Sequence, residues 1–223
     1  MTIADKKVKI QSILNVFETG SIKGDYANIS IFADGPNNMR QITYGKSQTT
    51  EWGALPILVR DYINNNGKYA NELKPYADKL GKVSLVDDKN LLDALKRAGS
   101  DPIMLTTQDA FFDKQYWNPA YKFAIDNKFE LPLSGLVIYD SYIHSGSIPG
   151  FLRNRFPETV PANGGNEKAW VVKYLETRKS WLATHSRPIL RKTVYRVNNM
   201  LAAVKDNNWT LEKSFNANGI VVA

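Results

Sequence analysis

Residues 10–52 read IQSILNVFETGSIKGDYANISIFADGPNNMRQITYGKSQTTEW, and this stretch decides the architecture that we expect. Apolar side chains recur at the i, i+3, i+4, i+7 spacing of an amphipathic helix, namely at Ile10, Ile13, Leu14 and Phe17. Gly20 is a stop signal, because glycine readily adopts the left-handed backbone that ends many helices. The stretch therefore predicts a helix that ends close to Glu18.

Glu18 falls on the last turn of this helix, one position round from the apolar Phe17. A carboxyl that is partly shielded by apolar neighbours holds its proton to a higher pH, as a general acid must. Glu18 is therefore a candidate general acid.

A hairpin is expected to follow the helix. Residues 26–32 (YANISIF) have strand composition with a partial alternation, residues 34–38 (DGPNN) form a turn, and residues 40–45 (RQITYG) return as a second strand. Asp34 then stands at the junction of strand and turn. We expect the carboxyl groups of Glu18 and Asp34 to face each other across a groove.

The composition is that of a soluble globular protein, with 223 residues of which 43% are hydrophobic and 23% charged. This length suits one domain over residues 1–223. The sequence contains no apolar run long enough for a transmembrane helix, and its first residues lack the apolar core of a signal peptide. We expect either a cytosolic protein or the mature form of a secreted one.

Cysteine is absent and only His144 and His185 represent histidine. The sequence therefore excludes disulfides, thiolate nucleophiles and thiolate metal ligands, and it argues against a histidine-rich metal centre. We expect neither a metal nor a cofactor.

The formal net charge of +7 favours an anionic partner such as nucleic acid or cell wall. The basic residues are nevertheless scattered, without an RNA-binding or DNA-binding motif. A cationic substrate would need a locally acidic cleft, for which residues 10–52 offer four acidic residues, Glu18, Asp25, Asp34 and Glu51.

The rest of the chain reads as mainly helical. Apolar periodicity predicts helices over residues 54–63, 69–80, 88–98, 167–183 and 189–207, with further helices beginning at Thr106 or Thr107 and at Asn118, and a short strand over residues 220–222. The aromatic residues between these helices are expected to be core, namely Phe111, Phe112, Tyr116 and Trp117.

Residues 131–144 (LPLSGLVIYDSYIH) are apolar nearly all round, which predicts a helix through the centre of the molecule. Asp140 lies within it, and a buried charge is costly unless it is paired. We therefore expect a basic partner for Asp140.

These residues together resemble the family 46 chitosanases. The amino-terminal similarity rests on Phe17-Glu18-x-Gly20, about sixteen residues to the Asp34-Gly35 turn, and a strand that closes on Gly45 before a Thr-rich segment. An Asp after an aromatic residue in the central helix, followed by two arginines, adds a second match at Asp140, Arg178 and Arg196. The resemblance spans residues 10–222.

The resemblance implies a mainly α (α+β), lysozyme-like fold, with two lobes separated by a substrate cleft and a small β-hairpin or sheet lining that cleft. It assigns Glu18 as general acid and Asp34 as the general base that activates water. The supporting network would be Asp140, Arg178 and Arg196. An inverting reaction needs the two catalytic carboxyls roughly 6.5–9.5 Å apart.

One departure from the family concerns the turn after Asp34. The family usually has Asp-Gly-Arg-Gly-Tyr-Thr, in which the Thr helps to hold the attacking water, whereas this chain has no Thr at that offset. Gln41 or Thr43 would take over the orientation of water. Glu51 becomes the candidate for binding a glucosamine ammonium, with Tyr26 and Arg40 as further candidate substrate-binding residues.

The function implied is that of an endo-acting chitosanase, which cleaves β-1,4 bonds between glucosamine units of chitosan with inversion and without a cofactor. The resemblance also implies a secreted monomer that binds neither nucleic acid nor membrane. Three alternatives stay open: a lysozyme-like muramidase or endolysin acting on peptidoglycan, which the net charge favours, a nucleic-acid-binding module, and a chitosan-binding protein without activity.

Overall fold

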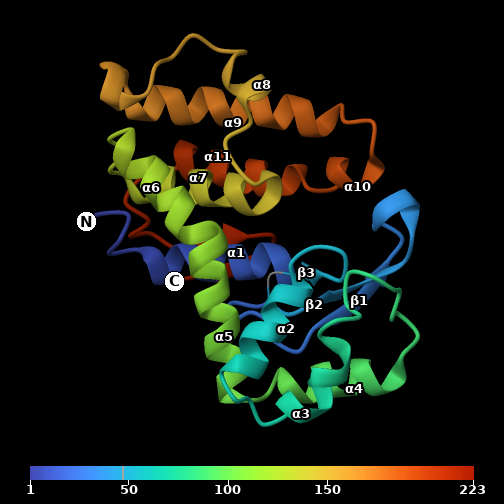
Figure 1. The fold of residues 1–223 in the computed structure, drawn as a ribbon. Helices are drawn as coiled ribbons and strands as arrows, with labels where there is room; N and C mark the ends of the chain where they lie inside the picture. Colours follow the sequence, from blue (N-terminus) through green and yellow to red (C-terminus); the bar gives the residue numbers. More distant parts are fainter. Residues whose placement is uncertain (47) are drawn as a thin grey trace. The chain divides into compact units, whose positions relative to one another are not determined.

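Figure 1 shows the computed structural model, which describes residues 1–46 and 48–223. The chain forms two compact units, of which unit 1 comprises Met1–Phe17 and Lys114–Ala223 and unit 2 comprises Glu18–Asp113. The fold is mainly α with two small antiparallel sheets, which confirms the predicted class. None of the helices in the described residues is long and apolar enough to cross a membrane.

Helix α1 (Lys7–Thr19) is the predicted amphipathic helix and runs from unit 1 to the first residues of unit 2. Its apolar face is buried, at Ile10, Ile13, Leu14, Val16 and Phe17. Gly20 follows with φ +69°, a backbone conformation that L side chains rarely adopt. The predicted stop signal and the position of Glu18 on the last turn are therefore confirmed.

The sheet of unit 2 contains the predicted hairpin. Strands β1 (Ile29–Phe32) and β2 (Gln41–Tyr44) are antiparallel, with Ile29 opposite Tyr44 and Phe32 opposite Gln41, and the 3-10 turn η1 (Pro36–Asn38) lies between them. A third strand that we did not predict, β3 (Thr49–Thr50), pairs with β2.

The predicted first strand, residues 26–32, was too long. The side chain of Asp25 accepts a hydrogen bond from the main-chain N–H of Ala27 at 3.0 Å. An aspartate that bonds the backbone two residues on makes a local turn, which competes with strand pairing. Residues 26 and 27 are therefore in a turn and β1 begins at Ile29.

The helices of unit 2 are α2 (Leu55–Asn64), α3 (Ala70–Leu73), the 3-10 turn η2 (Lys74–Tyr76), α4 (Lys89–Ala98) and α5 (Pro102–Phe112). The predictions for α2 and α4 are confirmed to within one residue. The single helix predicted over residues 69–80 was wrong, because α3 ends before Pro75 and a proline inside a helix removes a backbone donor.

The predicted start of α5 at Thr106 or Thr107 was also wrong. The helix begins at Pro102, and the Asp101 side chain caps it by accepting from the N–H of Ile103 at 3.1 Å. Aspartate at the N-cap followed by proline at the first helical position is a strong start signal that the periodicity alone did not reveal.

A π-helical turn η3 (Asp113–Trp117), which lies in unit 1 from Lys114 onward, leads into the helices and the two-stranded sheet of that unit. These elements are α6 (Asn118–Asp126), α7 (Pro132–Ser145), α8 (Gly150–Arg153), the 3-10 turn η4 (Pro161–Asn163), α9 (Glu167–Ala183), α10 (Pro188–Arg191), α11 (Val194–Lys205), β4 (Phe215–Ala217) and β5 (Ile220–Val222). The bounds of α9 and β5 are those predicted. The helix predicted over residues 189–207 is two helices, because Thr193 interrupts it and donates its hydroxyl to the carbonyl of Leu190 at 2.7 Å.

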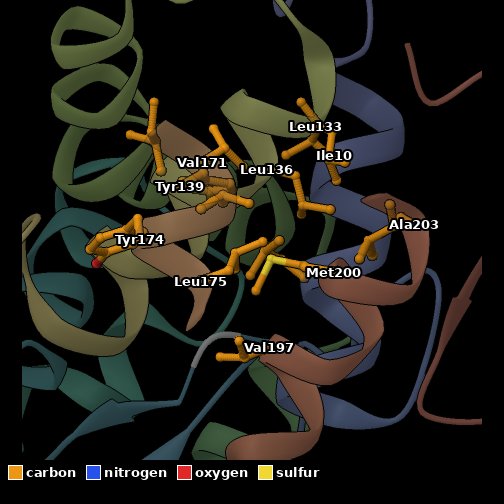
Figure 2. Close-up of a cluster of buried hydrophobic side chains, with 14 of the residues drawn as sticks. Ile10, Leu133, Leu136, Tyr139, Val171, Tyr174, Leu175, Val197, Met200 and Ala203 are labelled. Carbon is orange, nitrogen blue, oxygen red and sulfur yellow. The ribbon is translucent and has the colours of Figure 1, made fainter. Parts of the chain in front are cut away.

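The core of unit 1 is built around α7, as Figure 2 shows. Every residue of α7 from Pro132 to Ser141 is buried, which confirms the central helix predicted from its apolar sequence. Side chains of α1, α9 and α11 pack against it, among them Ile10, Val171, Leu175, Val197 and Met200. Burying an aliphatic side chain of this kind contributes about 1.5–3 kcal/mol.

Three of the four aromatic residues expected in the core are buried there, namely Phe111, Phe112 and Trp117. Tyr116 is half-buried and packs against the core of unit 1.

Candidate active site

Glu18 is half-buried on the last turn of α1. The last carbonyl groups of a helix have no partner within the helix. The Gln48 side chain provides a partner for one of them, because its Nε2 donates to the main-chain oxygen of Glu18 at 2.6 Å. The backbone from which the Glu18 carboxyl projects is therefore held by a side chain next to β3.

Asp34 is exposed to solvent at the junction of β1 and the following turn. Nε2 of Gln41, at the start of β2, donates to Oδ1 of Asp34 at 2.9 Å. Oε1 of the same Gln41 amide accepts from the main-chain N–H of Trp52 at 3.4 Å. The N–H of Trp52 thus fixes which end of the amide faces the carboxylate, and Gln41 orients Asp34.

Thr43, the other candidate for orienting water, is buried on the same face of β2 as Gln41. Its hydroxyl and that of Ser30, its partner across the strand pair, make no hydrogen bond to any residue that the structure describes. Buried hydroxyl groups normally have a partner, so this polar pair is able to accept one.

Tyr26 is engaged by residues of its own unit. Its hydroxyl donates to Oδ1 of Asp109 at 2.9 Å, and the Lys46 ammonium bonds the same carboxyl and lies 5.1 Å from the centre of the Tyr26 ring. Burial, together with the Asp109 hydrogen bond, raises the pKa of Tyr26 above its usual range. The structure thus shows Tyr26 as part of an ion-pair cluster.

Arg40 lies at the surface and forms an ion pair with Asp87 at 3.4 Å. Both side chains are more than half exposed. The guanidinium is therefore accessible to a ligand from solvent.

In unit 1, Asp140, Arg178 and Arg196 form the predicted network, and all three side chains are buried. Nη1 of Arg178 donates to Oδ2 of Asp140 at 2.5 Å, while Nε of Arg196 donates to Oδ1 at 2.8 Å. Asp140 therefore has two basic partners, which confirms the expectation that its charge is paired. Figure 1 places α9, which carries Arg178, and α11, which carries Arg196, alongside α7.

The two guanidinium groups determine the ionisation of this site. Burial of the carboxyl opposes ionisation, but the charges of Arg196 and Arg178 outweigh it and lower the pKa of Asp140 to about 2. His144 stands one turn further along α7, where burial and the same two positive charges lower its pKa to about 4. Asp140 is therefore ionised and His144 neutral at pH 7.

The network also reaches the residue that precedes Glu18. The Arg196 guanidinium lies 5.2 Å from the centre of the Phe17 ring, and the hydroxyl of the neighbouring Tyr195 donates to the main-chain oxygen of Phe17 at 2.9 Å. Helix α11 thus contacts the last turn of α1 through both residues.

Comparison with known proteins identifies the family of the chain. The sequence profile described as "Glycosyl hydrolase family 46" matches residues 12–215, which is most of the chain. The chain belongs to this family. It is therefore a glycoside hydrolase. No curated protein matches the sequence significantly.

Solved structures place the chain in the same fold as family 46 chitosanases. The native chitosanase from Bacillus subtilis MY002 has a TM-score of 0.83, with 24% sequence identity and 98% coverage of both chains. A mutant of that enzyme complexed with 6 GlcN has a TM-score of 0.85 at 23% identity, again with 98% coverage of both chains. A Gynuella sunshinyii family 46 chitosanase in complex with chitotetraose has a TM-score of 0.80 at 21% identity, and the match covers 98% of this chain and 96% of that one.

Glu51 of this family 46 enzyme, for which we predicted a contact with a substrate ammonium, is fully buried. Its Oε2 accepts from the N–H of Ile42 at 3.1 Å, and its Oε1 accepts from the N–H of Leu85 at 2.6 Å. Its own N–H donates to the Ile42 carbonyl at 2.8 Å. In this conformation the carboxylate joins β2 to residues 84–86 and presents no surface to a ligand.

Sequence reasoning named Gln41 as a candidate, but it missed Gln48, which bonds the backbone of Glu18, and the Lys46–Asp109 ion pair beside Tyr26. Gln48 was overlooked because the Thr-rich segment that contains it was used only for the resemblance to the family. The ion pair was overlooked because Lys46 and Asp109 are 63 positions apart in the sequence. The positive φ of Gly45, +82°, marks the turn that brings Gln48 toward Glu18. Gly45, directly after β2, was a local signal of that turn.

Among the residues that the structure describes, no group of three or more acidic, histidine or cysteine side chains could hold a metal ion.

Proposed function

We propose that this family 46 enzyme is an endo-acting chitosanase that hydrolyses β-1,4 bonds between glucosamine units with inversion. Glu18 acts as the general acid and Asp34 as the general base. The observation that carries the proposal is the hydrogen bond from Gln41 to Asp34, since it orients an exposed carboxylate that is able to reach a water molecule.

In the proposed reaction, Glu18 gives its proton to the glycosidic oxygen as the bond to the anomeric carbon breaks. A water molecule attacks that carbon from the opposite face and gives its proton to Asp34. Proton exchange with solvent then restores both carboxyls. Each of the two proton transfers contributes on the order of 10²–10⁴-fold to the rate.

Gln41 and Thr43 have separate parts in this scheme. Gln41 keeps Asp34 in the orientation of a base through its own link to the Trp52 N–H. Thr43 is the candidate for holding the attacking water, because its buried hydroxyl bonds no residue that the structure describes. The Asp140 network supports Glu18 through the contacts that Arg196 and Tyr195 make with Phe17.

Chitosan is the proposed substrate because the similar solved chitosanases are complexed with 6 GlcN and with chitotetraose. Arg40 and Tyr26 remain candidates for contact with the sugar. Glu51 does not, since its carboxylate is buried. We further propose that the enzyme works as a secreted monomer.

A muramidase that cleaves peptidoglycan is the second candidate. The net charge of +7 favours it, because an anionic cell wall attracts a basic protein whereas polycationic chitosan is repelled by one.

The test measures reducing-end release from highly deacetylated chitosan, chitin and peptidoglycan, using the wild type, Glu18→Gln and the exposed control Glu130→Gln. We expect activity on chitosan alone, a loss of at least about 100-fold in Glu18→Gln, and wild-type rates in the control. Activity only on peptidoglycan would select the muramidase. Binding to chitosan with no release of reducing ends would leave a binding protein without activity.

A further inference from the structure

We propose that Gln48 is a positioning residue for the general acid. Each of the two proton transfers then depends on a different neutral amide side chain. Gln48 holds the backbone of Glu18, and Gln41 holds the carboxylate of Asp34. This inference rests on the proposed function, because it assigns Gln48 to the transfer of a proton to the leaving group.

The contact between Gln48 and Glu18 acts at the C-terminal end of α1. The last carbonyl groups of an α-helix have no donor within the helix. Gly20, which follows α1, meets no heavy atom within 4 Å of the place where a Cβ would stand. The amide of Gln48, 2.6 Å from the Glu18 carbonyl, therefore supplies a restraint on the backbone that aims the acid.

Gln48 is itself held in place by its turn. Its N–H donates to the Gly45 carbonyl at 3.1 Å, and the N–H of Gly45 donates to the Asn28 carbonyl at 2.9 Å, which ties the turn to the start of β1. The backbone of Gln48 has φ +56°, a region that residues other than glycine rarely occupy. Such a conformation persists only where the surroundings fix it.

The buried side chain of Gln108 provides a second anchor for this turn. Its Oε1 accepts from the N–H of Lys46 at 3.1 Å, and its Nε2 donates to the Tyr26 carbonyl at 2.9 Å. The Lys46 ammonium in turn pairs with Asp109. Helix α5 therefore fixes the turn from which Gln48 reaches Glu18.

Because Gln48 acts on the acid and Gln41 acts on the base, the effect of losing each hydrogen bond on the rate should depend differently on the leaving group. A leaving group that departs as a stable anion needs no proton, so its rate does not depend on how well Glu18 is aimed. Loss of the Gln48 hydrogen bond should slow the cleavage of chitosan and spare a dinitrophenyl glycoside of a glucosamine oligosaccharide. Loss of the Gln41 hydrogen bond should slow both, because both reactions need an activated water.

The experiment compares Gln48→Met, Gln41→Met and the exposed control Gln115→Met, since methionine keeps the length of glutamine and removes its donor. For Gln48→Met we expect kcat to fall about 10- to 100-fold on chitosan and to stay within about twofold on the dinitrophenyl glycoside. For Gln41→Met we expect similar losses on both substrates. The proposal would be overturned if Gln48→Met lowered kcat equally on both substrates, or if it left kcat on chitosan unchanged.

Amide hydrogen exchange makes the test independent of the substrate. The last turn of α1, residues 16–19, should exchange faster in Gln48→Met than in the wild type or in Gln115→Met. Unchanged exchange would overturn the positioning role. If the wild type cleaves no chitosan while exchange rises as expected, the failure lies with the proposed function and the contact itself stands.

Discussion

Two carboxylates of this chain, Asp140 and Asp34, are held in opposite ways. In unit 1, Asp140 is buried between the guanidinium groups of Arg178 and Arg196. In unit 2, Asp34 is exposed and accepts from the neutral amide of Gln41. A guanidinium brings a full opposing charge to the carboxylate, whereas an amide brings a hydrogen bond without a charge.

This difference separates a group that stabilises the fold from one that can do chemistry. A carboxylate whose pKa is lowered to about 2 stays ionised over the whole working range and is a poor acceptor for a proton. A carboxylate that an amide orients keeps access to water and carries no compensating charge. We therefore interpret Asp140 as a structural anchor for α7, α9 and α11, and Asp34 as the group that activates water.

The largest expected effect is on catalysis at Asp34. Asp34→Asn keeps the size of the side chain and removes the base, so kcat on chitosan should fall by about 10²–10⁴-fold. Because Asp34 is exposed, the free energy of unfolding should change by less than about 1 kcal/mol. Reducing-end assays and urea unfolding measure the two quantities. A variant with near wild-type activity would remove Asp34 from the mechanism.

The loss of Asp140 from the network in unit 1 should have its main effect on the free energy of unfolding. Asp140→Ala leaves two buried guanidinium groups without their counter-ion, which should lower the free energy of unfolding by about 3–5 kcal/mol. The exposed Asp206→Ala serves as the matched control. Urea unfolding measures both variants, and a cost below about 1 kcal/mol for Asp140→Ala would contradict the structural role.

The pH dependence of stability should fall into two windows. The pKa of His144 is lowered to about 4 in the folded protein, so its contribution is present above its ordinary value of 6.5 and is lost as the pH falls toward 4. The pKa of Asp140 is lowered from 3.8 to about 2, so its contribution is lost below about pH 4.

Urea unfolding between pH 7 and pH 2 separates the two windows. His144→Gln should flatten the decline of the unfolding free energy between about pH 6.5 and 4, and Asp140→Asn should flatten the decline at lower pH. A decline that both variants retain unchanged would show that other groups cause it.

Substitution of Glu51 should lower the free energy of unfolding by a smaller amount than the loss of Asp140. Glu51→Gln turns one of two buried acceptors into a donor that faces the N–H of Ile42 or Leu85, so the free energy of unfolding should fall by about 1–3 kcal/mol. Because the side chain is buried, KM for chitosan should stay within about twofold of the wild type. A large rise in KM with unchanged stability would restore the predicted contact with a substrate ammonium.

Much of this fold could be predicted from local sequence patterns. The apolar spacing indicated α2, α4 and α9 nearly residue by residue, and α1 from Ile10 to its end, because each of these helices buries one face. Local chemistry that periodicity does not record caused the errors, namely the Asp25 turn before β1, the Asp101 cap of α5 and Thr193 between α10 and α11.

The candidate site was predictable only in part. A charge in an apolar helix requires a partner, so the position of Asp140 in residues 131–144 already implied a basic residue beside it. No comparable rule applied to Gln41 and Gln48, because a neutral amide is acceptable at the surface and in the interior alike. The burial of Glu51 was equally hidden, since its two donors come from backbone positions, Ile42 and Leu85, that leave no mark in the sequence.

The most direct test of Glu18 and Asp34 as acid and base on opposite faces of the sugar is the stereochemistry of the product. The measurement follows the proton NMR spectrum of the reducing ends that the wild-type enzyme forms from a glucosamine oligosaccharide, before the anomers equilibrate. We expect the α-anomer to appear first, because inversion of a β-bond yields it. Initial formation of the β-anomer would mean retention and would contradict the assignment of Asp34 as a base.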